Sequence, residues 1–109
     1  MKPTKQWLEE VAKEYEAKNW FALARLLDVT RSSISQQVNG LHSISVTTAL
    51  KVADLLGVHP LAVISSSAYE ASKSDEHKDL WKRVHEAYAG LKADSRCSIY
   101  KPPPGWNEP

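Results

Sequence analysis

The chain of 109 residues has one cysteine, four glycines, one phenylalanine and no long hydrophobic run. A lone Cys97 excludes an intramolecular disulfide framework and a cysteine-based zinc cluster, and it suits a reducing compartment. The longest apolar runs fall far short of the ~20 residues that a membrane-spanning helix needs. No leader with a positively charged start and an apolar centre is visible. We therefore expect a cytoplasmic protein without a membrane segment.

The chain also lacks an excess of either positive or negative charge. The 14 Lys and Arg residues nearly balance the 13 Asp and Glu residues, which leaves a formal net charge of +1. The composition therefore lacks the strongly basic balance that marks many nucleic-acid-binding domains. With 42% hydrophobic residues the chain can bury one modest core, so we expect one small domain with extensions. A nucleic-acid function has to be argued from local pattern.

Helical periodicity dominates the first 64 residues. Apolar residues recur at three- and four-residue spacing over residues 4 to 18, which predicts an amphipathic helix. Asn19 is a candidate N-cap for a second helix that ends near Asp28, and a third is expected from about residue 31 to 39. Gly40 is the candidate stop of the third helix. A fourth helix is predicted between the cap Ser45 and the stop Gly57, and a short fifth helix begins at His59-Pro60.

The C-terminal part differs in composition. Serines cluster between Ser65 and Ser74, which indicates a frayed helix end or linker over residues 68 to 74. Residues 75 to 93 predict a further amphipathic helix, with Asp75 as candidate cap and the apolar stripe Leu80, Trp81, Val84, Tyr88 and Leu91. The proline-rich residues 94 to 109 are expected to form an extended tail. The predicted fold is all-α: a five-helix unit in residues 1 to 67, then a linker, a helix and a tail.

The segment ALARLLDVTRSSISQQVNG, residues 22 to 40, joins two apolar repeats through a β-branched turn. Ala24 is small where two helices approach closely, Val29 fills the turn, and Ile34 and Val38 face inward on the second helix. This arrangement is typical of a helix-turn-helix, whose second helix enters the major groove of DNA. The inward positions leave one polar row facing out: Arg31, Ser32, Ser35, Gln36 and Asn39.

The side chains of this row suit DNA. Arginine can bond O6 and N7 of guanine, glutamine can bond N6 and N7 of adenine, serine adapts to either, and asparagine commonly bonds phosphate. No acidic residue stands between Val29 and Ala53, so the row carries no charge that repels phosphate. The alternative is a helical hairpin used for packing or protein contacts, but a solvated face more often carries Lys and Glu.

The ordered set of motifs over roughly residues 19 to 64 resembles the phage-repressor and Cro-like helix-turn-helix regulators, the XRE or lambda-repressor-like family. The motifs are Leu23-Ala24, DVTRSSIS at residues 28 to 35, Val38-Asn39-Gly40 and ALKVADLLGV at residues 49 to 58. The resemblance implies base reading by Arg31, Ser32 and Gln36, a phosphate contact by Asn39, and a place for His42 in the loop that follows the recognition helix. Ser35 is a further base-reading candidate because it faces out in the same row.

Two positions depart from the family pattern. Asp28 stands in the turn where glycine or a small residue is usual, and aspartate adopts a left-handed conformation less readily than glycine. Trp20 stands where many relatives place a glutamine that bonds phosphate. Its indole N–H could donate one bond to the DNA backbone instead.

These features predict a sequence-specific double-stranded DNA-binding transcriptional regulator, a phage or prophage-type repressor acting as a homodimer on a palindromic operator. The expected dimer or helix-packing residues are Trp81, Val84, Tyr88 and Leu91. The alternative is an antitoxin that autoregulates through the same motif and binds a toxin protein through its C-terminal part. The sequence shows no carboxylate pair, nucleophile–base arrangement, phosphate loop or metal-spaced cluster, so we expect neither an enzyme nor a cofactor.

Phe21 and Leu26 lie outside the predicted buried set of the second helix, which is Leu23, Ala24 and Leu27. One interpretation is a wider buried stripe on that helix. The other is that the C-terminal helix, from the same chain or a partner, covers both residues with Trp81, Val84 and Tyr88.

Overall fold

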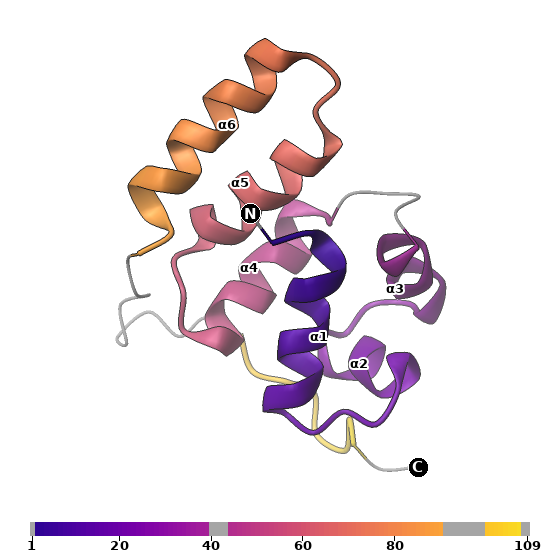
Figure 1. Ribbon diagram of the computed structural model, residues 1–109. Helices are drawn as coiled ribbons and strands as arrows, with labels where there is room; N and C mark the ends of the chain where they lie inside the picture. Colours follow the sequence, from indigo (N-terminus) through magenta and orange to yellow (C-terminus); the bar gives the residue numbers. More distant parts are fainter. Residues whose placement is uncertain (1, 40–43, 91–99, 108–109) are drawn as a thin grey trace.

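The computed structural model describes residues 2–39, 44–90 and 100–107, and this part of the chain contains six helices and no strand (Figure 1). The predicted all-α class is therefore confirmed. None of the described helices is both long and apolar enough to cross a membrane. The helices are α1 (Thr4–Glu14), α2 (Trp20–Leu26), α3 (Arg31–Val38), α4 (Val46–Leu56), α5 (Pro60–Ala71) and α6 (Asp75–Tyr88).

Helix α1 lies at the centre of the fold, where it contacts α2, α3, α4 and α5. Its apolar stripe is buried because the three- and four-residue spacing puts Trp7, Leu8 and Val11 on one face. Each such side chain contributes roughly 1.5–3 kcal/mol when it is fully buried. The other helices and the residues that flank them complete the core with Leu23, Ala24, Leu26, Leu27, Ile34, Ile44, Ala49, Val52, Ala53 and Val63.

Short polar side chains begin the helices at the expected places. The Ala22 amide donates to Asn19 Oδ1 (2.8 Å) at the start of α2, and the Thr48 amide donates to Ser45 Oγ (3.1 Å) at the start of α4. Each bond satisfies one amide that the first helical turn leaves without a partner. His59 caps α5, with Pro60 as its first residue, and Gly57 ends α4 in a left-handed conformation (φ 69°).

Helix α1 ends at Glu14, so the predicted extension to Lys18 is wrong. Glu16 adopts φ 56°, a left-handed conformation, and the Ala17 amide donates to the Ala12 carbonyl (2.8 Å). Such a bond is typical of a helix that ends at a left-handed residue, after which the chain changes direction. The reversal is favoured because it packs Ala17 against the core.

The serine-rich segment, for which a frayed helix end or linker is predicted over residues 68 to 74, is helical as far as Ala71. Helix α5 continues to Ala71, and Ser65, Ser66 and Ser67 are all buried. Ser67 Oγ accepts from the Ile44 amide (3.2 Å) and shares a hydrogen bond with Thr4 Oγ1 (3.2 Å). Small hydroxyl side chains allow close packing and still satisfy buried polar groups. A domain boundary at this point stays a prediction.

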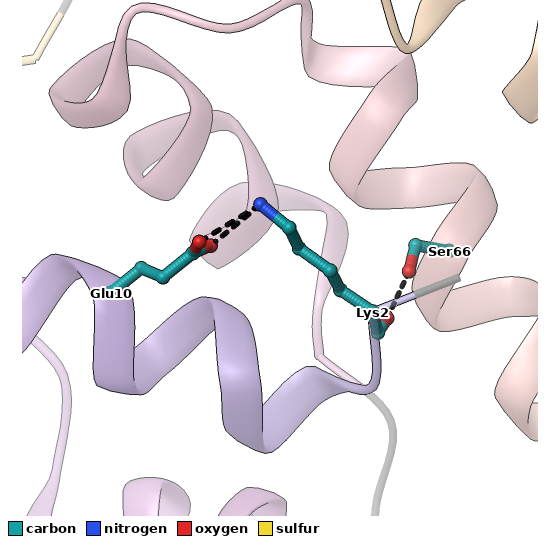
Figure 2. A network of polar contacts seen from close by, with 3 residues as sticks. All are labelled: Lys2, Glu10 and Ser66. Atoms are coloured by element: carbon teal, nitrogen blue, oxygen red, sulfur yellow. Dashed lines mark hydrogen bonds and ion pairs between the residues drawn. The ribbon is translucent and has the colours of Figure 1, made fainter.

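The segment before α1 is tied to α5, as Figure 2 shows. Ser66 Oγ donates to the Lys2 carbonyl oxygen, and Lys2 Nζ reaches the Glu10 carboxylate at 2.9 Å. The same ammonium lies 4.5 Å from the ring centroid of Trp7. Lys2 therefore covers one edge of the core while its charge stays near the surface.

Helix α6 is capped by Ser74, whose Oγ accepts from the His77 amide (3.2 Å), and the candidate cap Asp75 is instead its first residue. Among the described helices it contacts only α5, at the far end of the molecule from α2 and α3 (Figure 1). The ring of Tyr88 lies against His59 (4.8 Å between centroids), and His85 Nδ1 shares a hydrogen bond with Ser65 Oγ (3.1 Å).

The expectation that α6 of the same chain covers Phe21 and Leu26 is wrong. Leu26 is fully buried within the core, whereas the side chain of Phe21 is 49% exposed. Since α6 has no contact with α2 in this chain, the wider buried stripe accounts for Leu26 only. Leu91 lies outside the described residues.

Residues 100–107 of the tail lie against α2 and α4. The Tyr100 amide donates to Asp54 Oδ2 (3.0 Å), and the Tyr100 hydroxyl donates to the Leu26 carbonyl at the end of α2. Arg25 Nη2 donates to the Gly105 carbonyl (2.7 Å), and Trp106 packs against the core. The prolines keep residues 101–103 free of helix, as expected, but the segment is docked and turns at residues 104–107.

We expect the docked tail to make the protein sensitive to alkali. Burial, and secondly the negative charge of Asp28, raises the pKa of Tyr100 to about 12 from the 10.0 of a free phenol. A raised pKa means that the stabilisation is complete below pH ~10 and is lost as the pH rises towards 12. Thermal unfolding followed by circular dichroism should therefore show a fall in stability over this range that is smaller in Tyr100→Phe. Tyr69→Phe, outside the tail contact, is the control, and an equal fall in wild type and Tyr100→Phe would contradict the assignment.

Candidate nucleic-acid interface

The turn between α2 and α3 is closed by backbone hydrogen bonds. The Val29 amide donates to the Ala24 carbonyl (3.0 Å), and the Asp28 amide donates to the Arg25 carbonyl (3.2 Å). This pair of bonds requires a left-handed residue just after the helix. Asp28 supplies it with φ 54°, so aspartate takes the conformation that the motif more often gives to glycine.

Two side chains fix the ends of the helices on either side of the turn. Thr30 caps α3, since its Oγ1 accepts from the Ser33 amide at 3.1 Å. Lys51 of α4 donates from Nζ to the Leu27 carbonyl at the end of α2 (2.8 Å). A cation at a helix C-terminus also interacts favourably with the helix dipole. The first contact fixes the start of α3, and the second ties α4 to the end of α2.

Helix α3 has one buried face and one exposed face. Ile34 is fully buried and Val38 is partly buried against the core, as the spacing predicted. The opposite side presents a polar row in which every member is exposed: Arg31, Ser32, Ser35, Gln36 and Asn39. We call this set the α3 row. The structure confirms its exposure, and its binding to DNA stays a prediction.

Gln37 is a structural residue that the sequence reasoning did not assign. Its side chain is 5% exposed, and Nε2 donates to Ser33 Oγ (3.0 Å) one turn earlier. The signal was present, because Gln37 is three residues after the buried Ile34 and therefore shares its face. Neighbouring glutamines thus have different environments: Gln36 is exposed and Gln37 is buried.

Two predicted backbone contacts have different outcomes. Trp20, the first residue of α2, is half-buried and packs against the core. His42 lies outside the described residues, and so does the predicted stop Gly40.

Within the described ranges, no group of three His, Cys, Asp or Glu residues could hold a metal ion.

An aromatic side chain lies beside the α3 row. The guanidinium carbon of Arg31 is 5.8 Å from the ring centroid of Phe21, and that of Arg25 is 5.9 Å from it. The sequence pattern places Phe21 outside the predicted buried set of α2, but it does not predict this arrangement. The contact joins the first turn of α2 to the first residue of α3 across the turn, which no helical period predicts.

Comparison with known proteins finds a match to one family. Residues 22–63 match the protein family described as "Helix-turn-helix". No curated protein and no solved structure matches the chain significantly. The matched segment runs from α2 into α5 and contains the turn and the whole α3 row. Residues 22–63 are therefore similar to the helix-turn-helix family over the turn and the α3 row, in agreement with the resemblance to the XRE, lambda-repressor-like regulators.

Proposed function

We propose that the chain is a phage or prophage-type repressor that binds double-stranded DNA sequence-specifically, as a dimer on a palindromic operator. The observation that carries this proposal is the α3 row, a set of exposed hydrogen-bonding side chains on a helix anchored by Ile34. Such a helix fits the major groove, where each base pair presents its own pattern of donors and acceptors.

The members of the α3 row suit different parts of DNA. Arg31 and Gln36 have the forked donor and acceptor groups that pair with guanine and adenine edges. Ser32 and Ser35 lie beside them, and their short hydroxyls can either donate a hydrogen bond to a base edge or accept one from it. Asn39 follows the last turn of α3, where a phosphate contact suits its amide, and we assign Trp20 and His42 to the DNA backbone as well.

Charge contributes little to this readout. The α3 row contains one cation, Arg31, and the whole chain has a formal net charge of only +1. Because each neutralised phosphate adds about 0.9 to the slope of log affinity against log salt, we expect a shallow salt dependence. Hydrogen bonding to base edges then accounts for more of the selectivity than phosphate attraction does.

The test is a binding titration with the full chain against duplex DNA from upstream of its own gene, at about 50 and 200 mM salt. A random duplex of equal length is the control. We expect the upstream duplex to bind about 10³-fold or more tightly than the random one at the higher salt. Equal affinity for both duplexes would contradict sequence-specific binding.

The proposed dimer contact is the apolar face of α6. Leu80 is 52% exposed, and Trp81 and Val84 are half-buried next to it. Together with His77 these residues line a hollow of about 270 Å³. A face of this kind is covered in many proteins by a partner, since exposed contiguous apolar patches are uncommon on monomers. Tyr88 already packs against α5, so we assign it to helix packing.

We expect Val84→Asp to weaken self-association by about 30-fold or more, because a carboxylate would have to be buried without a partner. Sedimentation equilibrium of wild type and variant over a range of concentrations measures this. Val46→Ser is the matched control, since Val46 is a 62% exposed apolar residue on α4. A monomeric wild type, or a Val84→Asp variant that associates as wild type does, would overturn the assignment of this face.

The same exposed face of α6 supports a second function. As an antitoxin, the chain would regulate its own gene through the α3 row and hold a toxin protein against Leu80, Trp81 and Val84. A toxin gene beside this one, and a co-purifying complex that Val84→Asp breaks, would favour the antitoxin over the repressor.

A further inference from the structure

Phe21 is an exposed aromatic residue with charged neighbours on α2 and α3. Its side chain is 49% exposed, which is unusual for an aromatic residue so close to a core. The guanidinium carbons of Arg25 and Arg31 both lie within 6 Å of its ring centroid. An arginine in this position is attracted by the negative face of the ring.

The three side chains differ in how they are held. Arg25 is held by a second contact, because Nη2 donates to the Gly105 carbonyl of the docked tail at 2.7 Å. Phe21 is on the same helix, one turn earlier. Arg31 is the first residue of α3 and the only cation of the α3 row. The ring of Phe21, next to Arg25, therefore faces Arg31. Without this contact the long, exposed Arg31 side chain would sample many rotamers.

We propose that Phe21 is a positioning residue for Arg31. Its ring holds the Arg31 guanidinium at the front of α3 before DNA is bound. Less rotamer freedom is then lost on binding, and the guanidinium points in the direction that a base edge requires. This inference rests on the proposed function, because Arg31 has to be a DNA-reading residue for its position to affect selectivity.

Core packing does not explain the position of Phe21. The buried side of α2 consists of Leu23, Ala24, Leu26 and Leu27, which are all 0–2% exposed. Replacing a half-exposed ring opens no sealed cavity, so the loss of stability should be small. The remaining alternative is that Phe21 touches DNA itself. In that case Phe21→Leu would weaken DNA binding even when Arg31 is replaced by alanine.

The first test uses the free protein and does not depend on DNA. In NMR spectra the side-chain N–H of Arg31, assigned by its loss in Arg31→Ala, should carry a ring-current shift from Phe21. The shift should disappear in Phe21→Leu, which keeps the apolar bulk but removes the ring. It should remain in Phe21→Tyr, the matched control. An Arg31 signal that is unchanged by Phe21→Leu overturns the proposal.

The second test is a double-mutant cycle with the preferred duplex and the random duplex. Phe21→Leu should reduce affinity for the preferred duplex by about two- to fivefold. Phe21→Tyr, which keeps an aromatic ring, should bind this duplex as tightly as wild type does. In the Arg31→Ala background Phe21→Leu should have no effect. An equal loss in both backgrounds would mean that Phe21 contacts DNA directly, which overturns positioning. If wild type binds both duplexes equally, the proposed function fails instead.

Discussion

Ile34→Ala should lower the free energy of unfolding by about 2–5 kcal/mol, which is the usual cost of truncating a buried aliphatic side chain to alanine. Ile34 is fully buried and is the main apolar anchor of α3. The loss combines the transfer free energy of the removed atoms with the cost of the cavity that remains in the core beside α3. Urea unfolding followed by circular dichroism measures it.

Two variants calibrate that result. Ile34→Val removes one methylene and should cost about 0.5–1.5 kcal/mol. Ser32→Ala changes an exposed residue on the same helix and should stay within about 0.5 kcal/mol of wild type. If Ile34→Ala were as stable as Ser32→Ala, then Ile34 would not anchor α3.

Gln36→Ala should cost about 1–3 kcal/mol of binding free energy on the preferred duplex and relax the preference at one base position. The reason is that an adenine edge paired with the Gln36 amide loses both hydrogen bonds at once. Asn39→Ala should instead weaken binding to all duplexes alike, because a phosphate contact carries no sequence information. Titration against a set of duplexes, each with one base pair changed, separates the two patterns.

Gln6→Ala is the matched control for Gln36→Ala. Gln6 is an exposed glutamine of α1 that lies beside Lys2 and His85, close to α6. Its replacement should leave affinity and base preference unchanged. A uniform loss of affinity in Gln36→Ala, with the base preferences of wild type intact, would assign Gln36 to the DNA backbone.

Most helices were predictable from sequence because their causes are local. Apolar spacing defined the buried face of α1, and the caps Asn19, Ser45 and His59 each act within three residues of their own position. The helix-turn-helix was predictable for the same reason: Val29, Ile34 and Val38 share one side of a short segment. Once these face the core, the α3 row is exposed by helical geometry alone.

The errors occurred where long-range packing outweighed local preference. Serines usually favour turns and caps, which suggested a frayed helix end or linker from residue 68, yet α5 continues to Ala71. Ser67 on this helix is buried because it bonds Thr4 and Ile44, far away in the sequence. Glu16 ends α1 in a left-handed conformation because Ala17 then reaches the core. Neither contact leaves a pattern at a spacing of three or four residues.

The sequence by itself determined the helical class, the turn and the identity of the outward row, since each follows from residues within one or two helical turns of one another. Only the tertiary structure decided that Tyr100 and Gly105 dock on α2, that α6 packs on α5 and on no other described helix, and that Phe21 faces Arg31. These contacts join separate elements or residues as many as 80 positions apart. They form because the folded chain brings groups of matching chemistry together, which no local pattern of residues records.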